Sequence, residues 1–187
     1  MYLSKHGRRL VAAATIAASA IMLPAVALAA SGGPAAQPAA IGTCRTVQLT
    51  DWLGVPGNQT AGSSFYQLEI SNISHQACTL YGFPGVSAWR AGKRLGSPAA
   101  RSYGDPENLL TLAPHSTVHV ILQVVDVGVY SPASCHYEQA FALKVYAPGD
   151  YGWHLVPLTF EACAKHGPIF LRVTPAQHGT GIPGYSH

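Results

Sequence analysis

The chain has 187 residues, of which 10% are charged, and it contains 19 glycines and 14 prolines. This length suits one domain, and a composition poor in charge and rich in turn-forming residues is typical of exported β-proteins rather than helical ones. The net charge of +3 comes from Lys5, Arg8 and Arg9, because the rest of the chain has eight basic and eight acidic residues. Such a balance argues against a nucleic acid partner, since phosphate binding depends on clustered Lys and Arg.

The N-terminal segment has the features of a signal peptide. Its basic start is followed by an apolar run from Leu10 to Leu23 and by the triplet Ala27-Leu28-Ala29. These features predict a secreted or cell-wall-associated protein, cleaved after Ala29 and without stable membrane insertion after cleavage. Retention of the leader as an anchor is the alternative, since residues 10–30 are long enough to cross a bilayer. The expected parts are a signal peptide at 1–29, a flexible Ala/Pro/Gly linker at 30–42, a β-domain at 43–175 and a flexible tail at 176–187.

Short alternating runs predict strands throughout the β-domain. The clearest are Ser64–Ser71, Thr117–Asp126, Phe141–Tyr146 and Ile169–Val173, and in the third run Phe141, Leu143 and Val145 share one face. Shorter candidates are Arg45–Leu49, Ala77–Leu80, Val86–Arg90, Arg94–Leu95, Leu109–Leu112 and Trp153–Leu158, whereas Asp51–Gly62 is expected to be a loop. Eight or nine such strands without intervening helices predict an all-β, immunoglobulin-like β-sandwich, with a closed barrel as the alternative.

The four cysteines indicate a disulfide framework, because export places them in an oxidising compartment. Cys44, Cys78, Cys135 and Cys163 allow three pairings, and the sequence alone does not choose among them. We prefer the pairing of neighbours, Cys44 with Cys78 and Cys135 with Cys163. By closing a loop, each bridge would stabilise the fold by roughly 3 to 4 kcal/mol. A zinc site is disfavoured because no two cysteines have the close spacing of metal-binding pairs. We therefore expect no metal.

Several segments together resemble a known family. They are Cys78-Thr79-Leu80-Tyr81-Gly82-Phe83-Pro84-Gly85-Val86, Leu112-Ala113-Pro114 and Val145-Tyr146-Ala147-Pro148-Gly149, with Cys135 and Cys163 at matching places. Over residues 44 to about 175 the chain resembles the domain of unknown function 4232 (DUF4232), found in exported proteins of actinobacteria. The resemblance implies an exported or surface-attached β-domain with paired cysteines and no assigned reaction, so it supplies no catalytic residues. Within the motif, Pro84-Gly85 predicts a type II turn in which Gly85 has a positive φ.

Residues for catalysis are scarce. No Gly-x-Ser-x-Gly nucleophile turn occurs, and the only acids close in sequence are Asp105 and Glu107, on either side of Pro106. His115 and His119 have the spacing of two metal ligands on a helix, but on the predicted strand that interval spans about 13 Å. The sequence therefore predicts a protein without catalytic residues, metal or cofactor.

Aromatic side chains are the best candidates for contact with a ligand. Tyr146, Tyr151 and Trp153 lie in or beside one Gly- and Pro-rich turn, and Tyr81 and Phe83 lie in the family motif. Sugars are commonly held by stacking on such rings, and packing in the core is the competing interpretation. Trp89 is expected in the core, and Trp52 is left undecided.

These features favour a non-enzymatic, exported and monomeric domain that binds a cell-envelope polymer or another extracellular protein. Two alternatives stay open. One is a cell-envelope hydrolase whose acids and histidines, such as Asp105 and His119, meet only in three dimensions. The other is a secreted protease inhibitor, a role that small disulfide-bridged β-domains often have.

Overall fold

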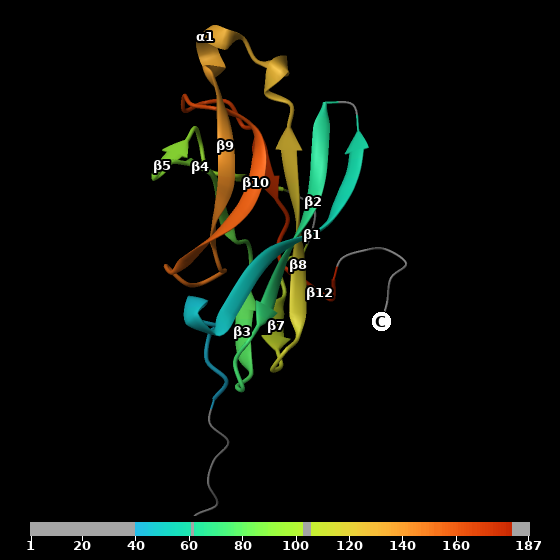
Figure 1. The fold of residues 1–187 in the computed structure, drawn as a ribbon. Helices are drawn as coiled ribbons and strands as arrows, with labels where there is room; N and C mark the ends of the chain where they lie inside the picture. Colours follow the sequence, from blue (N-terminus) through green and yellow to red (C-terminus); the bar gives the residue numbers. More distant parts are fainter. Residues whose placement is uncertain (1–39, 61, 103–105, 181–187) are drawn as a thin grey trace, which may run out of the picture. The chain divides into compact units, whose positions relative to one another are not determined.

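The computed structural model describes residues 40–60, 62–102 and 106–180 (Figure 1). The predicted signal peptide, most of the predicted linker and the last residues of the predicted tail lie outside the described residues. All described residues belong to one compact unit, Ala39–His187. Its strands are β1 (Leu49–Thr60), β2 (Ser63–Asn72), β3 (Cys78–Tyr81), β4 (Gly85–Arg90), β5 (Lys93–Leu95), β6 (Ala100–Arg101), β7 (Leu109–Leu112), β8 (Thr117–Val125), β9 (Tyr137–Tyr146), β10 (Trp153–Cys163), β11 (Leu171–Val173) and β12 (Gln177–His178).

Helices are few and short. The described residues contain two 3-10 turns, η1 (Thr46–Gln48) and η2 (Val127–Val129), and the four-residue helix α1 (Pro132–Cys135). In the described part of the chain no helix is long and apolar enough to cross a bilayer. The predicted all-β fold is therefore confirmed.

The strands form two larger sheets and one small sheet. One larger sheet has the order β1-β2-β8-β11-β6, with β12 also paired to β8, and the other has the order β10-β9-β4-β5, while β3 and β7 form a pair. Strand β1 contacts β10, and β11 contacts β4, between the two larger sheets. One buried cluster takes side chains from both, including Leu68, Leu122, Leu143 and Phe170. This arrangement agrees with the predicted immunoglobulin-like sandwich.

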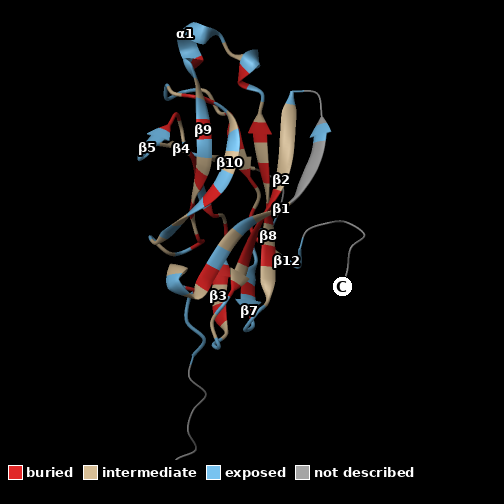
Figure 2. Cartoon of the chain, viewed as in Figure 1, coloured by how far each residue is buried: buried red, intermediate tan, exposed pale blue. Residues whose placement is uncertain are grey.

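The central strand β8 follows the predicted alternation. Val118, Val120, Leu122 and Val124 are buried and the residues between them are partly exposed, because successive side chains point to opposite faces of a sheet. The neighbouring strand β2 departs from the alternation of buried and exposed residues. Leu68 and Ile70 face the core as expected, but Glu69 on the opposite face is also buried. Figure 2 shows buried residues on strands of both larger sheets.

Two predictions near the start of the domain are wrong. The stretch Asp51–Gly62, expected to be a loop, largely forms β1, and Arg45–Leu49, expected to be a strand, contains η1. Strand β1 has register shifts against β2 on both sides of Pro56. Such irregularities accommodate a proline that cannot donate a backbone hydrogen bond, and they hide the alternation that marks a strand.

Two details of backbone and face also differ from the sequence-based expectation. Gly82, with φ of 87°, has the left-handed conformation expected at Gly85. Gly85 is instead extended, since it begins β4 and pairs with Tyr146. Phe141 is exposed although Leu143 and Val145, which share its alternation, are buried; Phe141 lies opposite a register shift between Pro157 and Phe160.

The two disulfides pair neighbouring cysteines, as preferred from the sequence. Cys44 is bonded to Cys78, and Cys135 is bonded to Cys163. The first bridge joins the residues before η1 to β3, and the second joins α1 to the end of β10. All four cysteines are buried, and disulfides of this kind are usual outside the reducing cytosol.

Part of the predicted tail, 176–187, forms a strand. Gln177 and His178 form β12, which pairs with His119 and Val118 of β8. Ala176, just before it, is buried.

Candidate functional site

Three aromatic rings gather around one lysine on the β10-β9-β4-β5 sheet. The Nζ atom of Lys144 lies 4.2 Å from the ring centre of Trp153, 4.4 Å from that of Trp89 and 5.4 Å from that of Tyr146. An ammonium at these distances is attracted by the electron-rich ring faces, by about 0.5 to 2 kcal/mol per ring. We call Trp89, Lys144, Tyr146 and Trp153 the aromatic face.

Strand pairing explains why these four side chains meet. Lys144 and Tyr146 are two residues apart on β9, so they point to the same side of the sheet. Trp153 of β10 lies directly opposite Tyr146, and Trp89 of β4 lies opposite Ala142. The intervening residues Leu143 and Val145 point into the core, which places the aromatic face on the outer side of the sandwich.

The aromatic face is open to solvent. Trp153 is 47% exposed, Leu155 beside it is equally exposed, and Trp89, Lys144 and Tyr146 are half-buried. Exposed apolar side chains that are contiguous on a soluble domain often mark a binding surface. This surface is therefore the candidate site.

The side chain of Asp150 fixes the turn between β9 and β10, which leads into Trp153. The carboxylate of Asp150 accepts hydrogen bonds from the backbone N–H and the side-chain hydroxyl of Thr46, at 2.5 and 2.6 Å. These two bonds lower the pKa of Asp150 to about 2, because they stabilise its charged form. A Cβ atom at Gly152 would collide with Thr46, so the turn and η1 approach each other closely. The contacts of Asp150 and Gly152 with Thr46 fix the turn and thereby the position of Trp153 at the start of β10.

The five aromatic residues predicted as ligand contacts fall in different places. Tyr146 and Trp153 meet at Lys144, whereas Tyr151 is 94% exposed in the turn between them. Tyr81 is exposed on β3. Phe83 packs on the core, with the Cζ atom of Arg101 5.2 Å from its ring centre.

Sequence reasoning missed two members of the aromatic face. Trp89 was expected in the core, but it is only half-buried and its ring contacts Lys144. Lys144 carries no motif, and the signal for both was their alternation with buried residues on β4 and β9. Trp52, left undecided, is 44% exposed on β1 and donates a hydrogen bond to Ser71.

One acid and one histidine meet between the two sheets. The Nδ1 atom of His154, on β10, lies 3.0 Å from Oδ2 of Asp51, on β1, whose side chain is almost fully buried. Burial raises the pKa of Asp51, and the contact with His154 partly offsets that rise. The residues are 103 positions apart, so no sequence motif marks the pair. Their contact connects the two sheets.

Glu69 is a second buried acid, on the outer side of the β1-β2-β8 sheet. It is opposite Trp52 on β1 and His119 on β8. Within the described part of the chain its Oε2 atom has no hydrogen-bond partner. Burial raises the pKa of Glu69 to about 7, because the charged form loses hydration.

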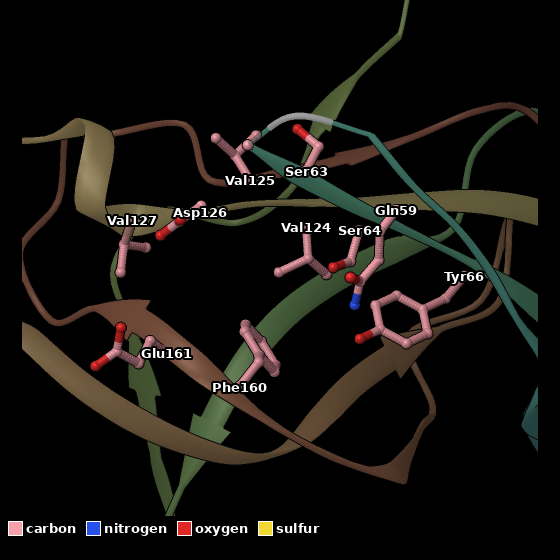
Figure 3. A pocket seen from close by; sticks show the side chains of 11 residues that line it. Gln59, Ser63, Ser64, Tyr66, Val124, Val125, Asp126, Val127, Phe160 and Glu161 are labelled. Carbon is pink, nitrogen blue, oxygen red and sulfur yellow. The ribbon is translucent and has the colours of Figure 1, made fainter.

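A pocket of about 340 Å³ opens between β2, β8 and β10 (Figure 3). Ser63 and Ser64 line it, together with the acids Asp126 and Glu161, but no histidine or lysine is among its lining residues. The described lining of this pocket therefore holds no serine–histidine or serine–lysine pair. In residues 40–60, 62–102 and 106–180, no three side chains of metal-binding type come together.

Of the residues weighed for catalysis, His115 and His119 are among those that the structure describes. Asp105 lies outside the described residues. His115 is in the turn before β8 with φ of 62°, and His119 is within β8, where its Nδ1 atom is 2.8 Å from the carbonyl oxygen of Gly179.

Comparison with known proteins now identifies the family. The model of the family described as "Domain of unknown function (DUF4232)" matches residues 44–177, which contain every strand from β1 to β11 and both disulfides. The chain belongs to this family. No curated protein and no solved structure matches it.

Proposed function

We propose that this protein is a non-enzymatic binding domain that acts outside the cytosol and holds a polysaccharide of the cell envelope. The single observation that carries the proposal is the aromatic face. Its rings come from three different strands of a sheet, and Trp153 is half-exposed there rather than buried in the core.

Aromatic rings on a rigid sheet suit a sugar polymer. The C–H groups of a sugar ring pack against an aromatic face, while its hydroxyls stay in water or bond to nearby polar groups. Strands β4, β9 and β10 fix the rings before the ligand arrives, so little side-chain freedom is lost on binding. The two disulfides support a location outside the reducing cytosol.

A co-sedimentation assay tests the proposal. The purified protein is mixed with washed cell envelopes of the producing organism and with insoluble polysaccharides, and the fraction that pellets is measured. We expect retention of the protein, and we expect the Trp153→Ala variant to be retained at least about fivefold less, since a stacked ring contributes on the order of 1 kcal/mol.

Trp52→Ala is the matched control. Trp52 is as exposed as Trp153 but lies on the other sheet, so its loss should leave retention unchanged. Equal retention of the Trp52 and Trp153 variants would contradict binding through the aromatic face. Release of soluble sugar from the pellets by the wild-type protein would contradict a non-enzymatic role.

A further inference from the structure

The outer side of the β10-β9-β4-β5 sheet carries positive charge. The strand pairing places the outward-facing residues of β4, β9 and β10 in three rows across the sheet, and Arg94 of β5 extends the row of Trp89, with which it pairs. The rows are Gly85–Tyr146–Trp153, Ser87–Lys144–Leu155 and Trp89–Ala142–Pro157. Among these positions two side chains, Lys144 and Arg94, are cationic and none is acidic.

The contacts of the two cations leave their charge uncompensated within the described part of the chain. Among the described residues, Lys144 has no salt bridge with a carboxylate, and its Nζ atom contacts the three rings. The Nη2 atom of exposed Arg94 lies 3.3 Å from Nε2 of His166, which is no anion. Of the other two basic residues in the β4-β5 hairpin, Arg90 lies 3.5 Å from the carboxylate of Glu138. Lys93 is opposite Arg90, at a position that alternates with Arg94 along β5.

The chain after the predicted leader has equal numbers of acidic and basic residues. The excess of positive charge on this face is therefore local and does not follow from the net charge. A ligand that covers this face without an anion would remove water from the two cations and give nothing in return. A ligand with anions would be attracted at a distance and would satisfy the free N–H groups of Lys144 and Arg94.

We propose that the aromatic face, extended by Arg94, selects an acidic polysaccharide whose carboxylates are attached to the sugar rings. The aromatic rings and the two cations together define the class of polymer. Stacking on Trp89, Tyr146 and Trp153 requires sugar rings, and the cation on either side of Trp89 requires anions placed along the same chain. A polyol phosphate without sugar rings would satisfy only the second requirement. This inference rests on the proposed function and narrows it to one class of polymer.

Binding to alginate, a polyuronate, compared with pullulan, a neutral glucan, tests the selection. Affinity is measured at 50 mM and 500 mM NaCl by the fluorescence of the tryptophans. We expect binding to alginate that is at least about tenfold tighter than binding to pullulan and that weakens at high salt, because salt screens exposed charges. Polyglycerol phosphate serves as the probe for an anion without sugar rings, and we expect weaker binding to it than to alginate.

Substitutions separate charge from packing. Lys144→Met keeps the contact with the rings but removes the charge. Arg94→Gln removes the second charge at an exposed position where folding is not at risk. Each is expected to weaken alginate binding by about fivefold or more, since a charged hydrogen bond is lost. Lys93→Met removes one charge from the same hairpin away from this face, and it should leave the affinity unchanged.

The outcomes distinguish this inference from the proposed function. Equal binding of alginate and pullulan, unaffected by Arg94→Gln, would overturn the inference and keep the proposed function. Tighter binding to polyglycerol phosphate than to alginate would also overturn it. No binding to any sugar polymer or to cell envelopes would overturn both.

Discussion

Replacing Glu69 by glutamine should raise the stability of this protein at neutral and alkaline pH. Glu69 is buried, no described residue bonds to its Oε2 atom, and its pKa is raised from 4.5 to about 7. The folded protein therefore binds a proton more tightly at this residue than the unfolded chain does. Where the folded state binds more protons, the free energy of unfolding falls as the pH rises.

The size of the effect follows from that shift. A change of one pKa unit corresponds to about 1.4 kcal/mol, so the wild-type protein should lose about 3 kcal/mol at most as the pH rises from about 4.5 to above 7. Glutamine has nearly the same shape and no charge to bury. The Glu69→Gln variant should match the wild-type protein below pH 4.5 and exceed its stability above pH 7.

Urea unfolding at pH 5 and pH 8, followed by tryptophan fluorescence with the disulfides intact, measures the difference. Both proteins are measured under the same conditions, so that the difference between their stability curves reports the replacement of Glu69. Glu161→Gln is the matched control, because Glu161 is an exposed acid of a strand and should leave the pH dependence unchanged. Parallel stability curves for the wild-type protein and Glu69→Gln between pH 5 and pH 8 would refute the reasoning.

Asp150→Ala should lower the melting temperature at pH 7, because the bonds to Thr46 are lost. The difference should fade as the pH falls from about 4 through 2, because the wild-type carboxylate takes up a proton in that range, and a difference that stays undiminished below pH 2 would contradict this account. Replacing Cys135 and Cys163 by serine should cost about 3 to 4 kcal/mol in urea unfolding, since 28 positions separate them; a loss below about 1 kcal/mol would count against a loop-closure effect. Gly96→Ala should cost at least about 2 kcal/mol, because φ is 58° and the new Cβ would lie 2.5 Å from a backbone oxygen; unchanged urea unfolding would show that the turn relaxes.

Strands with regular alternation could be predicted from the sequence, and β8 shows why. Its buried and partly exposed residues alternate without interruption, because a flat strand with one face in the core demands that pattern. Strand β1 could not be predicted in this way. Its glycines and Pro56 are turn residues in most contexts, and pairing with β2 keeps them extended here.

The candidate site was only half visible in the sequence. Tyr146 and Trp153 stand out because they flank one turn, and their cross-strand pairing follows from that hairpin. Trp89 reaches them through the pairing of β4 with β9, which joins segments more than 50 residues apart. A lysine among rings is recognised only once this register is known, since sequence spacing says nothing about which strands are neighbours.

The disulfide between Cys44 and Cys78 also decides how the domain would respond to a mechanical load. A pull on the segment ahead of Cys44 passes through the sulfur bridge directly to β3 and bypasses β1 and β2, which lie between the two cysteines in sequence. Neither of these strands can then be peeled from its neighbour by that pull. Reduction of this one bond would transfer the tension to β1, so the redox state of the surroundings sets where the domain begins to unravel.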